Sequence, residues 1–262
     1  MTSEALILIG RGTMPARNAI ETHATRLERS DAVEEVHAAT YEHEPIRELR
    51  EQVAAIDADR VYAMPAFVSH THDTIEELPR ALAAVPGEIQ YCEPLGGSSA
   101  VTDVLIDRAT ALVSAAEDAS LVLVGFGSGS TPYQRRTAEC HAARIEAHTA
   151  YGEVRTCYLL QNPAVECVRY NVSNDRAVAV PLFFARSEAT EKRIPAKLEL
   201  DRGGLAYADP LGDHPRITDA IRAEIEKRRV LASGGGSPRS FEARLTQQAR
   251  PVATDGEGMN GQ

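Results

Sequence analysis

Met64-Pro65-Ala66-Phe67-Val68-Ser69-His70-Thr71-His72-Asp73 is the stretch that decides the fold. Residues 61–68 are apolar and partly β-branched, which predicts a buried strand over residues 60–68, and residues 74–84 carry a helical pattern that includes Pro79. This order is typical of a parallel α/β sheet, in which ligands bind at the carboxyl ends of the strands. The two imidazoles and the carboxylate in the turn therefore favour a site for a metal ion or for proton transfer. A solvated loop that contains histidines by chance is the alternative interpretation.

The composition is that of an ordinary globular protein. Its 262 residues are 43% hydrophobic, enough for a real core, and its formal net charge of −10 argues against nucleic acid as a partner. No run of about 18 apolar residues is present, so we expect no membrane partner. The amino terminus lacks the basic region of a signal peptide, and the four cysteines form no Cys-x-x-Cys pair. We therefore expect a cytoplasmic protein with reduced thiols.

Apolar runs and helical patterns alternate along the first half of the chain. Strands separated by helices predict βαβ units and hence a parallel sheet. Strands are expected over residues 5–9, 33–41, 60–68 and 88–91, and helices over residues 16–29, 46–56, 74–84 and 101–116.

The second half of the chain repeats the first. Leu121-Val122-Leu123-Val124-Gly125-Phe126-Gly127-Ser128 matches residues 6–13, and Val180-Pro181-Leu182-Phe183-Phe184 matches residues 64–68. Matches in the same order over more than 100 residues indicate a gene duplication. The predicted fold is α/β, with two similar lobes that are each a four-stranded parallel sheet flanked by helices. The predicted divisions are an N-terminal lobe over 1–118, a C-terminal lobe over 119–230, and a Gly-rich flexible tail over 231–262.

The motifs at the strand ends form an ordered set that occurs twice. The first half carries Gly10-Arg11-Gly12-Thr13, Glu44-Pro45, Pro65-Ala66-Phe67-Val68-Ser69, Glu77-Leu78-Pro79 and Pro94-Leu95-Gly96. The second half carries Gly125-Phe126-Gly127-Ser128, Pro181-Leu182-Phe183-Phe184, Arg193-Ile194-Pro195 and Pro210-Leu211-Gly212. Over residues 5–228 this set resembles the class II chelatases. The most similar group is the CbiX-type sirohydrochlorin cobaltochelatases and ferrochelatases, in their duplicated two-lobe form.

The resemblance implies an enzyme, a metal chelatase (a lyase) that needs no ATP. It implies that Co²⁺ or Fe²⁺ is inserted into a sirohydrochlorin-type tetrapyrrole, in cobalamin or siroheme biosynthesis, within a cleft between the lobes. The expected partners are the tetrapyrrole and the metal ion, both as substrates, with no permanently bound cofactor. Because one chain supplies both lobes, we expect a monomer or a weak homo-oligomer.

The resemblance also implies roles for residues of the first lobe. The family histidine after the first strand falls on Arg11, with Phe126 at the same place in the second lobe, and the histidine after the third strand falls on Asp73. The family motif Asp-Ile-Pro falls on Glu77-Leu78-Pro79 in the first lobe and on Arg193-Ile194-Pro195 in the second. Imidazole and carboxylate can accept protons near neutral pH, whereas Arg11 stays protonated and suits a carboxylate of the ring. The second lobe is expected to serve as a wall or lid over the ring. The expected catalytic residues are Glu44, His70 and His72, the expected metal ligands are His70, His72, Asp73 and Glu44, and the expected substrate-binding residues are Arg11, Gly10, Gly12 and Ser69.

Some of these residues have simpler interpretations. Glu44 could cap the helix that begins after it, and His70 or His72 could be solvated loop residues. His23 and His141 occupy equivalent positions on two predicted helices, which indicates a shared packing role.

Two other functions compete with the chelatase hypothesis. A non-catalytic protein that carries or senses a tetrapyrrole or a metal is consistent with the missing first-strand histidines. A nucleotide-binding α/β enzyme is disfavoured, because the chain has no Gly-x-Gly-x-x-Gly motif after a strand.

Overall fold

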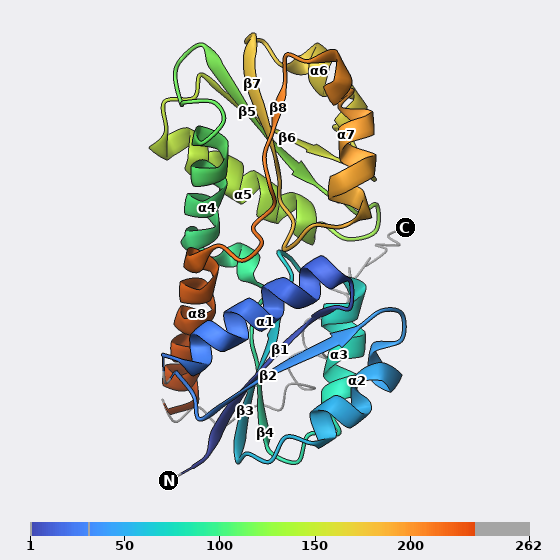
Figure 1. Ribbon diagram of the computed structural model, residues 1–262, viewed down its shortest axis with the longest axis vertical. Helices are drawn as coiled ribbons and strands as arrows, with labels where there is room; N and C mark the ends of the chain where they lie inside the picture. The colour runs from blue at the N-terminus through green and yellow to red at the C-terminus, as the bar shows by residue number, and fades with distance from the viewer. Residues whose placement is uncertain (1, 31, 234–262) are drawn as a thin grey trace, which may run out of the picture.

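The computed structural model describes residues 2–30 and 32–233, which form two similar lobes stacked along the long axis of the molecule (Figure 1). The first lobe contains a four-stranded parallel sheet with the strand order β2-β1-β3-β4. Its strands are β1 (Glu4–Arg11), β2 (Glu35–Tyr41), β3 (Arg60–Pro65) and β4 (Glu88–Tyr91), and its helices are α1 (Met14–Glu28), α2 (Pro45–Ala54), the π-helix η1 (Asp73–Glu77) and α3 (Leu78–Leu82).

The second lobe repeats this arrangement, with the strand order β6-β5-β7-β8 and all strands parallel. Two equivalent parallel sheets flanked by helices confirm the predicted fold class. The strands are β5 (Ala119–Gly125), β6 (Glu153–Tyr158), β7 (Arg176–Pro181) and β8 (Ala206–Tyr207), and the helices are α5 (Tyr133–His148), α6 (Val168–Asn171), the π-helix η4 (Ala189–Arg193) and α7 (Ile194–Lys197). Short 3₁₀ turns lie at Leu95–Gly97 in the first lobe and at Val165–Cys167 and Leu200–Arg202 in the second.

The third strand ends earlier than its apolar sequence predicts. β3 stops at Pro65, opposite Ile9 of β1, and not at Val68. The Ala66 N–H still donates to the Ile9 carbonyl at 2.7 Å, but the Phe67 N–H turns back to the Pro65 carbonyl at 2.9 Å. The chain therefore leaves the sheet three residues early, and residues 66–69 become part of a loop.

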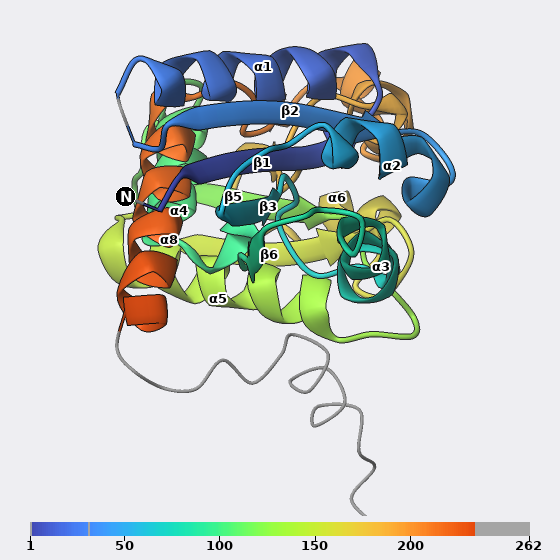
Figure 2. The same cartoon turned by 90° about the horizontal axis from the view of Figure 1, so that it is seen from below.

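The last helix of each repeat packs on the opposite lobe. α4 (Ser99–Thr110) packs against β7 and α5 of the second lobe, and α8 (Pro215–Ser233) packs against α1 and β3 of the first. α4 and α8 also contact each other along one side of the molecule (Figures 1 and 2). α4 ends at Thr110, so the prediction of a helix through Ala116 was wrong. Because the helices cross over, buried residues of both lobes belong to one continuous hydrophobic core.

Two buried histidines, each hydrogen-bonded to a threonine, join the lobes at these crossings. We call the two pairs the interlobe His–Thr pairs. His23 on α1 shares a 2.8 Å hydrogen bond between its Nδ1 and the Thr218 hydroxyl on α8. His141 on α5 makes the same 2.8 Å bond to Thr102 on α4. Both imidazoles are fully buried, so the predicted shared packing role is confirmed.

An ion pair strengthens the docking of α8 on the first sheet. The Arg229 guanidinium donates to Glu4 on β1 at 2.6 Å, and Tyr62 on β3 donates to the same carboxylate at 2.8 Å. α8 continues to Ser233, so residues 231–233 of the predicted tail are helical, and residues 234–262 lie outside the described residues. Within the described chain, every helix is too short or too polar to cross a bilayer.

Candidate functional site: the cleft between the lobes

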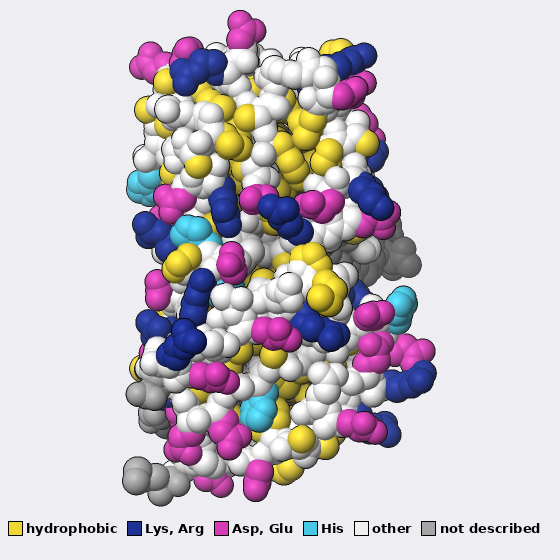
Figure 3. Space-filling model, viewed as in Figure 1, with side chains coloured by type: hydrophobic (Ala, Val, Ile, Leu, Met, Phe, Trp, Pro, Cys, Tyr) yellow, Lys and Arg dark blue, Asp and Glu magenta, His cyan; other side chains and the backbone are white. Residues whose placement is uncertain are grey.

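A cleft of about 860 Å³ lies between the two lobes, at the carboxyl ends of β1, β3, β5 and β7. This volume is at the upper end of the range for small-molecule sites, and the position is where parallel sheets bind ligands. Charged side chains of both signs lie across the middle of the molecule in Figure 3, and hydrophobic ones gather over the second lobe. The cleft therefore has room for a large ligand that contacts both lobes.

The first-lobe wall is organised around an ion pair between Arg11 and Asp73. The Arg11 guanidinium donates to Asp73 at 2.5 Å and to the Glu42 carbonyl at 3.0 Å, and it lies 4.8 Å from the centre of the Tyr41 ring. The buried Tyr41 hydroxyl also donates to Asp73, at 2.8 Å. Burial raises the pKa of Tyr41, so the phenol keeps its proton and remains a donor. The two positions that the resemblance gives to family histidines are thus in direct contact here.

His72 lies in the same wall, at the start of the π-helix η1. Its side chain is 66% exposed, and its ring nitrogens lie 3.7 Å from Glu76 and 3.9 Å from Glu77. Ser69, which was predicted to bind substrate, also lines the cleft. An exposed imidazole beside carboxylates can exchange protons with a ligand in the cleft.

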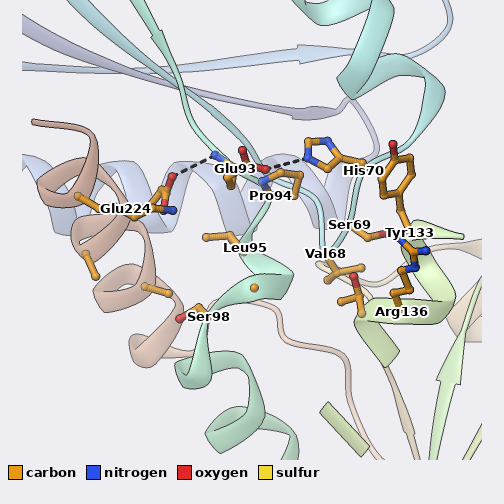
Figure 4. A pocket seen from close by; sticks show the side chains of 15 residues that line it. Val68, Ser69, His70, Glu93, Pro94, Leu95, Ser98, Tyr133, Arg136 and Glu224 are labelled. Atoms are coloured by element: carbon orange, nitrogen blue, oxygen red, sulfur yellow. Dashed lines mark hydrogen bonds and ion pairs between the residues drawn. The ribbon is translucent and has the colours of Figure 1, made fainter. Parts of the chain in front are cut away.

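His70 points away from the cleft, into a separate pocket of about 480 Å³ behind the loop. Its Nε2 is 2.8 Å from the Glu93 carboxylate, and the Tyr133 ring lies edge-on at 5.5 Å (Figure 4). The hydrogen bond from His70 is the main reason that the pKa of Glu93 falls to about 2. Glu93 is also bound by Arg228 and by the carboxylate of Glu224, which accepts its backbone N–H. His70 therefore joins the loop after β3 to the loop after β4 and to α8.

Glu44 lies on the outer surface of the first lobe. Its side chain is 63% exposed and pairs with Arg47 at 3.2 Å. Glu44 does occupy the N-cap position of α2, as its place before the helix suggested, but its side chain makes no cap hydrogen bond. Instead the Glu48 carboxylate accepts the backbone N–H groups of residues 42–44 at 2.7–2.9 Å.

The predicted metal set of Glu44, His70, His72 and Asp73 does not come together. Within residues 2–30 and 32–233, no group of three or more His, Cys, Asp or Glu side chains is placed to hold a metal ion. The strand order explains the separation, because β3 lies between β1 and β4. The loop after β3 sends Asp73 toward Arg11 on the β1 side and His70 toward Glu93 on the β4 side.

Gly10 and Gly12 also lie outside the cleft wall. A Cβ at Gly10 would come within 2.6 Å of the Ile20 side chain, and one at Gly12 within 2.9 Å of Glu42. These glycines allow β1 to pack closely against α1 and the end of β2, which is a role within the lobe.

The second-lobe wall is apolar and cationic. Phe126, at the end of β5, meets the Phe183 ring edge-on with centroids 6.3 Å apart, and the Arg193 guanidinium lies 5.7 Å from the centre of the Phe126 ring. Leu160 is 53% exposed in the same wall. Sequence reasoning anticipated a wall but did not assign Arg193. The available signal was that Arg193 stands before Ile-Pro, where the resembled family has aspartate.

Polar groups complete this wall. The Ser128 hydroxyl accepts hydrogen bonds from the backbone N–H groups of Ser130 and Thr131 just before α5, at 3.3 and 3.2 Å. Arg186 pairs with Asp209 at 2.6 Å, and these two residues occupy the places that His70 and Glu93 hold in the first lobe. Both lobes also border the cleft with a π-helix, η1 and η4, a rare element that is frequent at functional sites.

Comparison with known proteins identifies a family and relatives of this chain. The family model CbiX matches twice, over residues 5–112 and 120–228. The probable sirohydrochlorin cobaltochelatase of Halobacterium salinarum is 27% identical over 222 residues, which is 73% of this chain and 75% of that protein. The sirohydrochlorin ferrochelatase of Priestia megaterium is 36% identical over 90 residues, which is 34% of each chain.

A solved structure has the same fold. SirB from Bacillus subtilis with Fe³⁺ superposes with a TM-score of 0.68 at 19% identity, over 89% of this chain and 98% of that one. At this level of identity the likeness shows the arrangement of the two lobes.

Proposed function

The chain belongs to the CbiX family, and on that premise we propose that it inserts Co²⁺ or Fe²⁺ into a sirohydrochlorin-type tetrapyrrole. The observation that carries the proposal is the cleft of about 860 Å³ at the strand ends, walled by both copies of the family unit. The reaction needs no nucleotide. It belongs to siroheme or cobalamin biosynthesis, and we place it in the cytoplasm, in a monomer or a weak homo-oligomer.

The two walls of the cleft suit a planar macrocycle. Phe126, Phe183 and Leu160 offer an apolar surface to one side of the ring, and burial of flat apolar area favours binding. The hydroxyls of Ser128, Ser130 and Thr131 can donate to the carboxylates at the edge of the ring. Ring and metal are both substrates, so no permanently bound cofactor is required.

Metal insertion also requires a group that accepts the two pyrrole protons. His72 and Asp73 are the first-lobe groups in the cleft that can accept a proton or contact a metal ion. Arg11 lies beside them but stays protonated, so it cannot accept a pyrrole proton. Its ion pair orients Asp73. Because His70 and Glu44 lie outside the cleft, we assign direct contact with the metal ion and the pyrrole protons to His72 and Asp73.

A carrier or sensor of tetrapyrroles is the second candidate. It is favoured by the Arg11–Asp73 ion pair at the positions of the family histidines, and by the lack of a three-ligand metal cluster among the described residues. Such a protein would bind the ring without accelerating insertion.

An anaerobic absorbance assay distinguishes these functions. Sirohydrochlorin is mixed with Co²⁺ or Fe²⁺, with and without the protein, and the shift of the macrocycle bands is followed. Faster insertion than in the protein-free sample supports a chelatase. A spectral shift with the ring alone and no faster insertion supports a carrier, and no change of either kind refutes both functions.

A further inference from the structure

Two departures from the family pattern touch each other in the second-lobe wall. Phe126 stands where the resemblance places a histidine, and Arg193 stands where it places an aspartate. The Arg193 guanidinium lies over the Phe126 ring, with its central carbon 5.7 Å from the ring centre. A guanidinium within about 6 Å of an aromatic face is attracted to it, so the pair is held in place before any ligand arrives.

Arg193 differs from the other two arginines that line the cleft. Arg11 is bound to Asp73 at 2.5 Å, and Arg186 is bound to Asp209 at 2.6 Å. Arg193 has no carboxylate partner in the described part of the chain, although it is only partly exposed. A partly desolvated cation without a counter-ion favours the binding of an anionic group.

Within the described residues, the side-chain N–H groups of Arg193 make no hydrogen bond or ion pair. A guanidinium presents its N–H groups in a fixed planar fork, which can donate two parallel hydrogen bonds to one carboxylate. The chain as a whole carries a net charge of −10, which repels a polyanionic ligand. An arginine without a carboxylate partner therefore provides local positive charge that attracts a ligand with carboxylates at its edge.

We propose that Arg193, held over Phe126, binds a peripheral carboxylate of the macrocycle and selects for carboxylated tetrapyrroles. Phe183, edge-on to Phe126, continues the apolar surface beside the cation. This inference rests on the proposed function and assigns a specificity-determining residue within it. The second lobe thus positions the ring, while the proton and metal chemistry remains with the first.

The test is a binding titration with metal-free sirohydrochlorin, followed by absorbance. Arg193→Met should raise Kd roughly tenfold to a hundredfold, the loss expected for one charged hydrogen bond. The Kd of Arg193→Lys should lie between those of the wild type and Arg193→Met, because an ammonium keeps the charge but loses the planar fork of donors. Lys192→Met is the matched control, since Lys192 lies on the same π-helix outside the cleft wall and should bind as the wild type does.

A second titration uses the macrocycle with its carboxylates methyl-esterified. The wild type should bind this ester much more weakly than the acid, and Arg193→Met should lose a large part of that preference. If Arg193→Met melts below the assay temperature, Arg193→Gln replaces it and carries the same expectation.

The two titrations distinguish the role of Arg193 from the proposed function. Equal binding of the acid by wild type and Arg193→Met, with an unchanged preference over the ester, overturns the role of Arg193 and leaves the proposed function standing. Failure of the wild type to bind sirohydrochlorin at all overturns both.

Discussion

Replacing Thr218 with valine should destabilise the protein by removing one of the two interlobe His–Thr pairs. The His23 Nε2–H donates to the Gly212 carbonyl at 3.0 Å, because a carbonyl can only accept, and Nδ1 must then accept from the Thr218 hydroxyl. Valine has nearly the same shape but no hydroxyl. His23 is 0% and Thr218 3% exposed, so water cannot replace the lost donor.

The expected magnitude follows from this burial. An unsatisfied buried acceptor costs about 1–3 kcal/mol. In a protein of this size, each kcal/mol lowers Tm by about 2–4 °C, so a cost of about 2 kcal/mol lowers Tm by roughly 4–8 °C. Thr102→Val, which removes the equivalent partner of His141, should lower Tm by a similar amount.

Thermal unfolding followed by circular dichroism at pH 7.5 measures both effects. Thr25→Val is the matched control, because Thr25 is exposed on α1, and surface changes usually stay within about 0.5 kcal/mol. Since one core spans both lobes, we expect a single transition in every variant. A Tm for Thr218→Val equal to that of Thr25→Val, or separate melting of the two lobes, would refute the reasoning.

Three further predictions follow from the site and the buried histidines. Asp73→Asn should slow metal insertion at least tenfold, because it removes a carboxylate from the cleft and leaves Arg11 without its counter-ion. Steady-state kinetics measure the rate of insertion, and an unchanged rate would contradict the prediction. Glu93→Gln should loosen the loop after β3, because it weakens the hydrogen bonds to His70 and Arg228. Amide hydrogen exchange of residues 66–72 should become faster, and unchanged protection would show that the His70–Glu93 contact does not hold the loop. Burial lowers the pKa of His23 and lowers that of His141 to about 4, so the unfolded chain binds more protons than the folded chain below about pH 6.5. The free energy of unfolding should therefore be full above that pH and fall toward pH 4, and denaturant titrations in which it does not change over this range would refute the prediction.

Elements with strong local patterns were predictable from the sequence. The apolar run of β1 and the repeat of its Gly-x-Gly turn in the second lobe were enough to predict two parallel sheets. The end of β3 was not, because Pro65 and Phe67 are equally compatible with a strand and with the turn that the hydrogen bond between them forms. The sequence shows how long the run of apolar residues is, but where β3 ends depends on where its backbone stops pairing with β1.

The candidate site was harder to predict, because its residues diverge in space. His70, His72 and Asp73 are within four residues, yet β1 and β4 flank β3 and draw Asp73 and His70 to opposite sides. The role of His23 was visible from its equivalence to His141. Its partner Thr218 was not visible, because the crossing of α8 to the first lobe leaves no periodic signal in the sequence.

Contacts between distant segments of the second lobe were equally hard to predict. Phe126 in a family histidine position reads as a lost ligand, and only the fold shows that it supports Arg193. These residues are about 67 positions apart in the sequence and meet because η4 returns to the end of β5.

The most direct test of the account compares anaerobic metal insertion by the wild type, His72→Ala and His70→Ala. We expect the wild type to make insertion of Co²⁺ or Fe²⁺ into sirohydrochlorin faster than it is in the protein-free sample. His72→Ala should lose about a hundredfold or more of that rate, as expected for a lost proton acceptor, while His70→Ala should keep most of it. A wild type no faster than the blank, or loss of insertion in His70→Ala with full activity in His72→Ala, would contradict the central claim that the chemistry takes place in the cleft between the lobes.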